Sequence, residues 1–257
     1  MMRFRWLASP RLCGWLALAL SLAGFLAAAW VTWRIYEAVP HVEDELAYVW
    51  QANALADGYL SIPSPQHPAS FLVPFVVDHD GMRFGKYPPG WPAVLSLGIS
   101  LGLRAWVNPL LAGLGVWLTY CLGRRVFNPL VGLLAATLTV PSPFFLLNSG
   151  SLLPHPLGLV LSAGFAWTWL GAFGPQPSRR PWLPTLAASL LLLAMQLTRP
   201  MTALAVALPF CIHGLVRLHR GDPAERRRLL AVVLAGLIGV GLYLLWQYSL
   251  TGDPLLN

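Results

Sequence analysis

Long apolar stretches separated by short polar segments dominate the chain. Seven of them approach the length that crosses a bilayer, about 20 residues. They are residues 12–33, 105–123, 129–147, 156–173, 182–197, 201–216 and 229–249. A soluble domain could bury one or two such stretches in its core, but not all of them. The pattern therefore predicts an all-α integral membrane protein with about seven transmembrane helices.

A further apolar stretch, residues 91–103, is shorter than the others and is opened by Pro88, Pro89 and Pro92. If it crossed the membrane, every later loop would change sides. The arginines that follow the second span would then lie outside, against the usual distribution of basic residues. We therefore expect a juxtamembrane or re-entrant helix here.

Arginines flank the apolar stretches in alternate loops. They are Arg3, Arg5 and Arg11, then Arg124 and Arg125, then Arg179 and Arg180, and finally Arg217, Arg220, Arg226, Arg227 and Arg228. Cytoplasmic loops are rich in Lys and Arg, so these loops and the N-terminus are predicted to be cytoplasmic. The first stretch, 12–33, is longer than the apolar part of a signal peptide, which favours an uncleaved span.

Composition agrees with a membrane protein. Hydrophobic residues make up 56% of the chain, charged residues only 11%, and mean hydropathy is +0.61. A soluble domain carries about a quarter charged residues. The net charge of +7 comes mainly from arginines beside apolar stretches, so nucleic acid is not expected as a partner. The three cysteines have neither disulfide-framework nor metal-ligand spacing, and no metal site is assigned.

The segment 34–90 is predicted to be a large first outer loop that carries juxtamembrane helices. Of the ten acidic residues of the chain, seven lie in it: Glu37, Glu43, Asp44, Glu45, Asp57, Asp78 and Asp80. With the first span before it and the remaining spans within 105–249, the chain is expected to form one membrane domain over residues 1–257. Because the sequence ends soon after the last span, a C-terminal module is expected to be missing.

One helix is predicted from Pro40 to Gly58, with three consecutive acids in its first turn. Asp44, Tyr48 and Gln51 would share one face, and apolar residues would share another, as in a helix that lies at the membrane surface. The acids either complement the helix dipole only, or Asp44 is a general base at the membrane–water boundary. Both interpretations stay open on these residues alone.

A second polar segment, residues 82–92, carries Arg83 and Lys86, the latter being the only lysine of the chain. These cations either pair with acids of the loop or hold an anionic headgroup such as a polyprenyl phosphate. Two more polar positions are predicted on the same side of the membrane. Arg199 lies between two spans, where a lone arginine is usually functional or paired. His155 is either a site residue or a loop histidine.

Three segments resemble the first outer loop of GT-C glycosyltransferases, particularly the bacterial aminoarabinose-transferase and protein-mannosyltransferase-like branch. They are residues 43–52, 56–58 and 83–90. The turn at residues 197–200 is similar to an arginine-containing turn of the same family. The specific part of the resemblance covers about 50 residues, 40–92, and the layout of the spans extends it along the chain.

The resemblance implies an inverting glycosyltransferase. A sugar would move from a polyprenyl-phosphate donor to a lipid, glycan or protein acceptor at the periplasmic face of a bacterial inner membrane, among membrane lipids. Asp44 matches the catalytic aspartate of the family, and Glu45 lies beside it. The expected phosphate-binding residues are Arg83, Lys86 and Arg199. The expected lining residues are Tyr48, Gln51, Tyr87 and His155.

The family's second acidic motif is not evident after the third span, where Asn148, Ser151 and His155 stand instead. No metal ligands are therefore assigned, and a divalent cation, Mg²⁺ or Mn²⁺, is left open as a cofactor. Two other functions compete with the transferase. A transporter would also contain polar residues and proline breaks, although its charges are expected near mid-membrane and in paired repeats. A truncated, inactive remnant or assembly subunit would keep the fold without the activity.

Overall fold

The computed structural model describes residues 9–255, so Arg3 and Arg5 of the predicted basic N-terminus lie outside the described residues. The chain divides into two compact units, one ending at Val160 and the other beginning at Leu161. The boundary falls within helix α7 (His155–Phe173). The expectation of one membrane domain over residues 1–257 stays a prediction.

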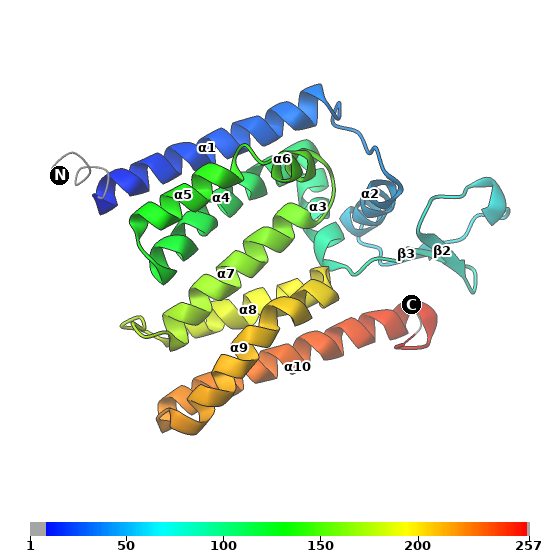
Figure 1. Cartoon of the computed structure of the whole chain (residues 1–257). Helices are drawn as coiled ribbons and strands as arrows, with labels where there is room; N and C mark the ends of the chain where they lie inside the picture. Colours follow the sequence, from blue (N-terminus) through cyan, green and yellow to red (C-terminus); the bar gives the residue numbers. More distant parts are fainter. Residues whose placement is uncertain (1–8, 256–257) are drawn as a thin grey trace. The chain divides into compact units, whose positions relative to one another are not determined.

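The first unit contains most of the helices (Figure 1). They are α1 (Pro10–Arg34), α2 (Glu43–Ala56), η1 (Pro68–Ser70), α3 (Gly90–Ser100), η2 (Arg104–Trp106), α4 (Val107–Val126), α5 (Pro129–Thr139) and α6 (Pro143–Gly150). Helices α1, α4 and α5 pack on one another, and α6 packs on α1 and α4.

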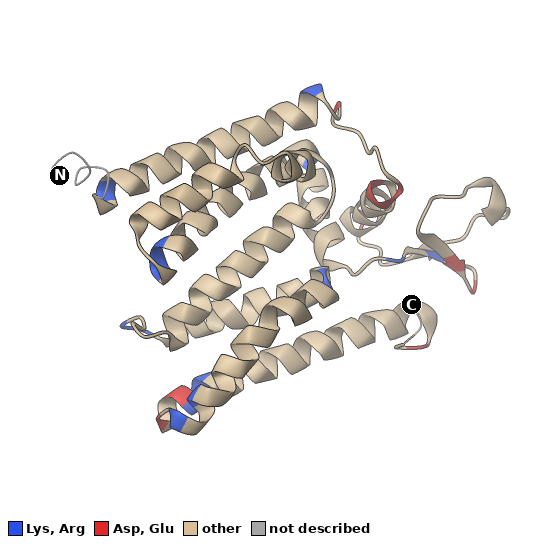
Figure 2. Cartoon of the chain, in the orientation of Figure 1, with Lys and Arg blue, Asp and Glu red and all other residues tan. Residues whose placement is uncertain are grey.

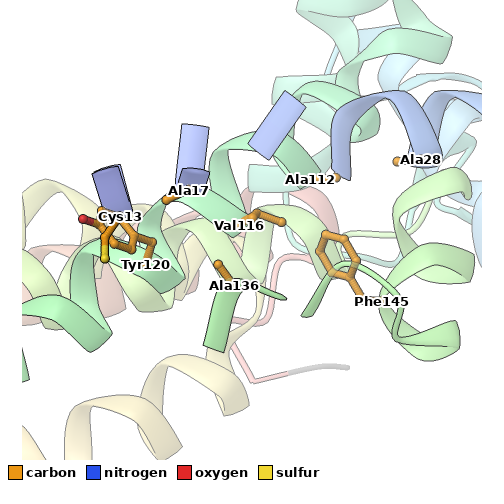
Figure 3. Close-up of a cluster of buried hydrophobic side chains, with 8 residues drawn as sticks. All are labelled: Cys13, Ala17, Ala28, Ala112, Val116, Tyr120, Ala136 and Phe145. Atoms are coloured by element: carbon orange, nitrogen blue, oxygen red, sulfur yellow. The ribbon is translucent and has the colours of Figure 1, made fainter. Parts of the chain in front are cut away.

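Small side chains allow these helices to approach closely. Figure 3 shows eight buried residues at this interface, including Ala17, Ala112 and Ala136. A Cβ atom at Gly132 of α5 would lie 2.5 Å from the carbonyl oxygen of Tyr120 in α4. Only glycine fits at that distance, so the α4–α5 contact depends on it. Close packing of small residues is the usual way in which membrane helices associate, because burial from water does not drive them together.

The segment 34–90 contains a small antiparallel sheet that the sequence did not lead us to expect. Its strands are β1 (Ile62–Pro63), β2 (Val76–His79) and β3 (Met82–Gly85), in the spatial order β1-β3-β2. His79 pairs with Met82 across a two-residue turn. The turn residues Asp80 and Gly81 have φ values of 49° and 76°, as a type I′ hairpin requires. The expectation of juxtamembrane helices alone was therefore incomplete.

The second unit contains the rest of α7 together with α8 (Trp182–Thr198), α9 (Pro200–Arg220) and α10 (Pro223–Thr251). Helix α8 packs along α10. At their contact the Gln196 side-chain amide donates to the carbonyl oxygen of Gly236 at 3.1 Å, and Gly239 leaves room for this side chain.

The structure confirms an all-α membrane protein. Among the described residues five helices have the length and composition of a span: α1, α4 with η2, α7, α9 and α10. The predicted span 129–147 is not one straight helix. It is the pair α5 and α6, bent by 66°, which gives up to six spans if the pair is counted as one. The break follows from Pro141 and Pro143, which cannot donate backbone hydrogen bonds, and from Ser142, which caps α6.

Two further apolar helices, α3 and α8, are shorter than the five helices with the length of a span. Helix α8, predicted as a span, has 17 residues. Helix α3 falls in the stretch predicted to be juxtamembrane or re-entrant and has 11 residues. At a rise of 1.5 Å per residue it is about 16 Å long, roughly half of a bilayer's hydrocarbon thickness.

Candidate functional site

Helix α2 begins at Glu43, three residues after the predicted start at Pro40. The reason lies in the Glu45 carboxylate, which accepts hydrogen bonds from the backbone N–H groups of His41, at 2.6 Å, and Val42, at 3.2 Å. These bonds satisfy donors that precede the helix and thereby fix its first turn. All three consecutive acids lie in that turn, as predicted.

The three acids have different surroundings. Glu43 is exposed, Asp44 is half-buried and Glu45 is buried with 2% of its surface accessible. On the same helix Tyr48 and Gln51 are buried, whereas the apolar side chain of Leu46 is exposed. The polar face of α2 is therefore the face that packs against the protein, where α3 and β3 contact the helix.

The structure brings Asp44, Tyr48, Gln51 and Tyr87 together. The Tyr87 hydroxyl donates to Oδ1 of Asp44 at 2.5 Å. The Tyr87 and Tyr48 rings lie 4.5 Å apart between centroids, and the Gln51 amide donates to the Tyr87 carbonyl oxygen at 3.0 Å. Burial and the hydrogen bond to Asp44 raise the pKa of Tyr87 well above its ordinary value. Tyr87 therefore stays protonated and remains a donor to the carboxylate at physiological pH.

Lys86 lies next to this group and is exposed. Its backbone N–H donates to the Phe75 carbonyl oxygen at 2.9 Å, and its Nζ lies 5.7 Å from the Phe75 ring centroid. Within residues 9–255 no carboxylate forms an ion pair with this ammonium group. The charge thus lies over the Phe75 ring, which itself packs edge-on against the Tyr87 ring at 5.6 Å between centroids, and it stays open to an anion.

Arg83 has a different environment from Lys86. It is 5% exposed and donates to both carboxylate oxygens of Asp78, at 2.8 and 2.6 Å. It also donates to the carbonyl oxygens of Phe71 and Pro68. Its guanidinium therefore ties the β2–β3 hairpin to the segment that precedes it. The predicted role of Arg83 at a donor phosphate stays a prediction, although its donors are already engaged within the loop.

The Arg83–Asp78 pair makes the loop sensitive to acid. Hydrogen bonds from Arg83 and from Ser64 hold the pKa of Asp78 below its ordinary value. A carboxyl with a depressed folded pKa contributes stability above its unfolded pKa, about 3.9, and loses it as pH falls through the folded value. We expect the protection of backbone amides in residues 64–85, relative to their intrinsic exchange rate at each pH, to decrease as pH is lowered below about 4.

The matched variants are Asp78→Asn and Asp80→Asn. Asp78→Asn is expected to exchange rapidly already at neutral pH, because it cannot form the ion pair. Asp80 is a largely exposed turn residue, and its variant should behave as wild type. An Asp78→Asn loop as protected as wild type at neutral pH would contradict the structural role of the pair.

Glu45 joins α2 to the loop between α6 and α7. Its Oε1 accepts from the backbone N–H of Leu152 at 2.6 Å. The same loop is bound by three other side chains, none of which sequence reasoning selected for this role. Thr32 of α1 donates to the Gly150 carbonyl, Trp91 of α3 to the Leu152 carbonyl, and Asn108 of α4 to the carbonyls of Ser151 and Leu153. We call this set of four side chains the loop clamp.

Two predicted site residues lie apart from the Asp44–Tyr87 group along the chain. His155 is the first residue of α7, directly after the clamped loop, and is half-buried. Arg199 directly precedes α9 in the second unit and is also half-buried. Their roles stay predictions.

The sequence left a divalent cation, Mg²⁺ or Mn²⁺, open as a cofactor, and this stays a prediction. Within the described part of the chain, no group of three His, Cys, Asp or Glu side chains could hold a metal ion. Both oxygens of Glu45, the acid next to Asp44, are used by backbone donors.

The arrangement supports proton transfer beside an anion. Oδ1 of Asp44 accepts from Tyr87, whereas Oδ2 makes no hydrogen bond to the described residues, so it is available to take a proton. Lys86, the residue before Tyr87, contributes an exposed cation that can stabilise a negative leaving group.

Comparison with known proteins gives the family. A search of curated proteins and a search of solved structures each found no match. The family described as oligosaccharyl transferase STT3, N-terminal, matches residues 100–250, more than half of the chain. The match begins at the end of α3, so the segment with Asp44 and Lys86 lies outside it. The chain belongs to the oligosaccharyl transferase STT3 N-terminal family and is a glycosyltransferase of the GT-C type.

Proposed function

We propose that this glycosyltransferase moves a sugar from a polyprenyl-phosphate donor to a lipid, glycan or protein acceptor, with inversion at the anomeric carbon. The reaction takes place at the membrane surface that carries segment 34–90. The arginine distribution favours the non-cytoplasmic side for this segment, and the family resemblance makes that side the periplasmic face of a bacterial inner membrane. The observation that carries the proposal is the half-buried Asp44 carboxylate, which accepts a hydrogen bond from Tyr87. The neighbouring residue in the sequence, Lys86, has an ammonium group that forms no ion pair among the described residues.

The chemistry requires few groups. An acceptor hydroxyl or amine attacks the anomeric carbon, Oδ2 of Asp44 takes its proton, and the bond to the phosphate oxygen breaks. The leaving phosphate is already an anion, so no general acid is needed. Lys86 stabilises the charge that the phosphate gains, and Tyr87 keeps the Asp44 carboxylate in one orientation.

The resemblance of residues 43–52 and 83–90 to the aminoarabinose-transferase and protein-mannosyltransferase-like branch supports a donor with a single phosphate. The segment that carries this resemblance lies outside the family match, so the branch rests on the sequence alone. We assign Tyr48 and Gln51 to the wall of the site, since both contact Tyr87. Arg83 and Glu45 are assigned to holding the loop.

The test is a transfer assay in membranes with radiolabelled polyprenyl-phosphate sugars. The Lys86→Ala variant is expected to raise the KM for the donor roughly tenfold or more, because it loses a charge-assisted contact to phosphate. Lys86→Arg should restore part of the affinity. Arg34→Ala, which removes an exposed cation at the end of α1, is the control and should transfer as wild type.

Three outcomes would contradict the proposal. Transfer from nucleotide sugars but not from lipid-linked sugars would rule out the donor class. A Lys86→Ala variant with unchanged KM would remove Lys86 from the donor site. A wild-type chain that transfers nothing, in any length of the protein, would favour the inactive remnant or assembly subunit.

A further inference from the structure

The second unit has a long apolar groove of about 570 Å³ along α9. Its lining runs from Pro200 and Tyr243 at one end to Leu218 and Leu229 at the other. Residues 200 and 218 of the same helix are about 27 Å apart at 1.5 Å per residue. Only 6% of the apolar window of α9 is buried, so the helix that forms the wall of the groove is itself unusually open.

A group of arginines lies directly beyond one end of this groove. The last turn of α9 and the first turns of α10 carry Arg217, Arg220, Arg226, Arg227 and Arg228, and we call these helix ends with the residues that join them the basic turn. Figure 2 shows these blue segments gathered where α9 and α10 meet. The basic turn and the groove are continuous along the chain, because Leu218 follows Arg217 and Leu229 follows Arg228.

The acids of the basic turn are already engaged. Glu225 pairs with Arg217 at 2.7 Å, and Asp222 caps α10 by accepting from the Glu225 N–H at 2.7 Å. Five arginines against two acids leave a formal charge of +3.

The remaining arginines have unused donors. Arg226 and Arg227 are exposed, and the Arg228 guanidinium lies 6.0 Å from the ring centroid of Phe173 at the end of α7. The Arg228 Nε atom is buried and has no hydrogen-bond partner among residues 9–255. A cationic donor that is shielded from water without an acceptor is costly, and an anion at this place would satisfy it.

We propose that the second unit binds an anionic phospholipid, with its phosphate headgroup on the basic turn and an acyl chain in the groove along α9. An acyl chain fits the apolar lining, and a headgroup of net negative charge complements the +3 of the turn. A lipid without net charge would leave the cluster unneutralised. The lipid belongs to the membrane leaflet on the side where α9 is joined to α10. Its binding does not depend on the sugar-transfer reaction.

The headgroup is tested by native mass spectrometry of the full chain in detergent, titrated with phosphatidylglycerol or with phosphatidylcholine of the same acyl chains. Wild type is expected to bind phosphatidylglycerol about tenfold or more tightly than phosphatidylcholine. Arg226→Gln/Arg227→Gln should lose this preference, and Arg11→Gln/Arg124→Gln, which removes two exposed arginines from the first unit, should keep it. Equal binding of both lipids by wild type, or equal losses in both variants, would overturn the proposal.

The acyl chain is tested separately. Ala207 lines the groove, and Ala207→Trp is expected to fill it and to weaken phosphatidylglycerol binding with every arginine in place. Glycerol phosphate, which has the headgroup charge but no chain, should not displace the lipid. Binding by Ala207→Trp as tight as wild type would overturn the role of the groove. Displacement by glycerol phosphate at lipid-like concentrations would make the basic turn a site for soluble phosphate instead. The thermal midpoint of each variant in detergent checks that it is folded.

Discussion

Replacing Asp44 by Asn is expected to lower the rate of sugar transfer about 10²–10⁴-fold, the range that a general base contributes. Asn has nearly the same shape and can still accept the hydrogen bond from Tyr87, but its amide cannot take a proton from the acceptor. The loss should therefore appear in kcat, with the KM for the donor little changed. The measurement is transfer from a radiolabelled polyprenyl-phosphate sugar at matched protein levels in membranes.

The control for this variant is Asp57→Asn, which makes the same change at the exposed C-terminal end of the same helix. It should transfer at the wild-type rate. Detergent gel filtration and the helical circular dichroism signal establish that both variants are folded. Wild-type transfer by Asp44→Asn would exclude this carboxylate as the base and leave the proton to another group.

Replacing Glu45 by Ala is expected to lower the free energy of unfolding by on the order of 3 kcal/mol, since hydrogen bonds to charged groups contribute about 1.5–3 kcal/mol each. The variant loses three backbone partners, those of His41, Val42 and Leu152, and leaves the Leu152 N–H buried without an acceptor. A decrease of the thermal midpoint by about 10 °C is the corresponding measurement for a unit of this size.

Glu43→Ala is the matched control, since Glu43 lies in the same turn and is exposed. Its midpoint should change little. The Glu45→Gln variant separates the two roles considered for this residue. If Glu45 holds the loop, Gln lowers the midpoint, because only its carbonyl oxygen can accept a backbone N–H, whereas Glu45 uses both of its oxygens, one for His41 and Val42 and the other for Leu152. A lower kcat at an unchanged midpoint would instead assign Glu45 to the chemistry.

The helical part of the fold could be predicted because apolar length and composition determine which segments span a membrane. Each of the predicted spans coincides with a helix or with the bent pair α5 and α6. The bend itself could have been inferred from Val140-Pro141-Ser142-Pro143, since proline interrupts helical hydrogen bonding. The hairpin also had a signal, because Asp80-Gly81 between β-branched and aromatic residues is a strong indication of a type I′ turn.

The grouping of Asp44, Tyr48 and Gln51 on one face was accessible from helical spacing alone. Helical spacing could not predict which residues elsewhere in the chain contact that face. Tyr87 contacts Asp44 from 43 positions away, and Glu45 binds Leu152 from 107 positions away. Such contacts depend on how the helices pack. For the same reason the sequence did not indicate that Trp91 and Asn108 bind the loop between α6 and α7.

The loop clamp acts almost wholly on main-chain atoms of residues 150–153. The hydrogen bonds of the clamp therefore require no particular side chain at Leu152 or Leu153, whereas Gly150 must stay glycine, because a Cβ atom there would clash with the Val31 side chain. Substitutions at Leu152 or Leu153 that keep the backbone conformation leave every acceptor in register with its donor. Inserting or deleting a single residue there would shift that register, and α1, α2, α3 and α4 would lose their common anchor at once. The number of residues in this segment is thus more strictly constrained than the side chains at Leu152 and Leu153.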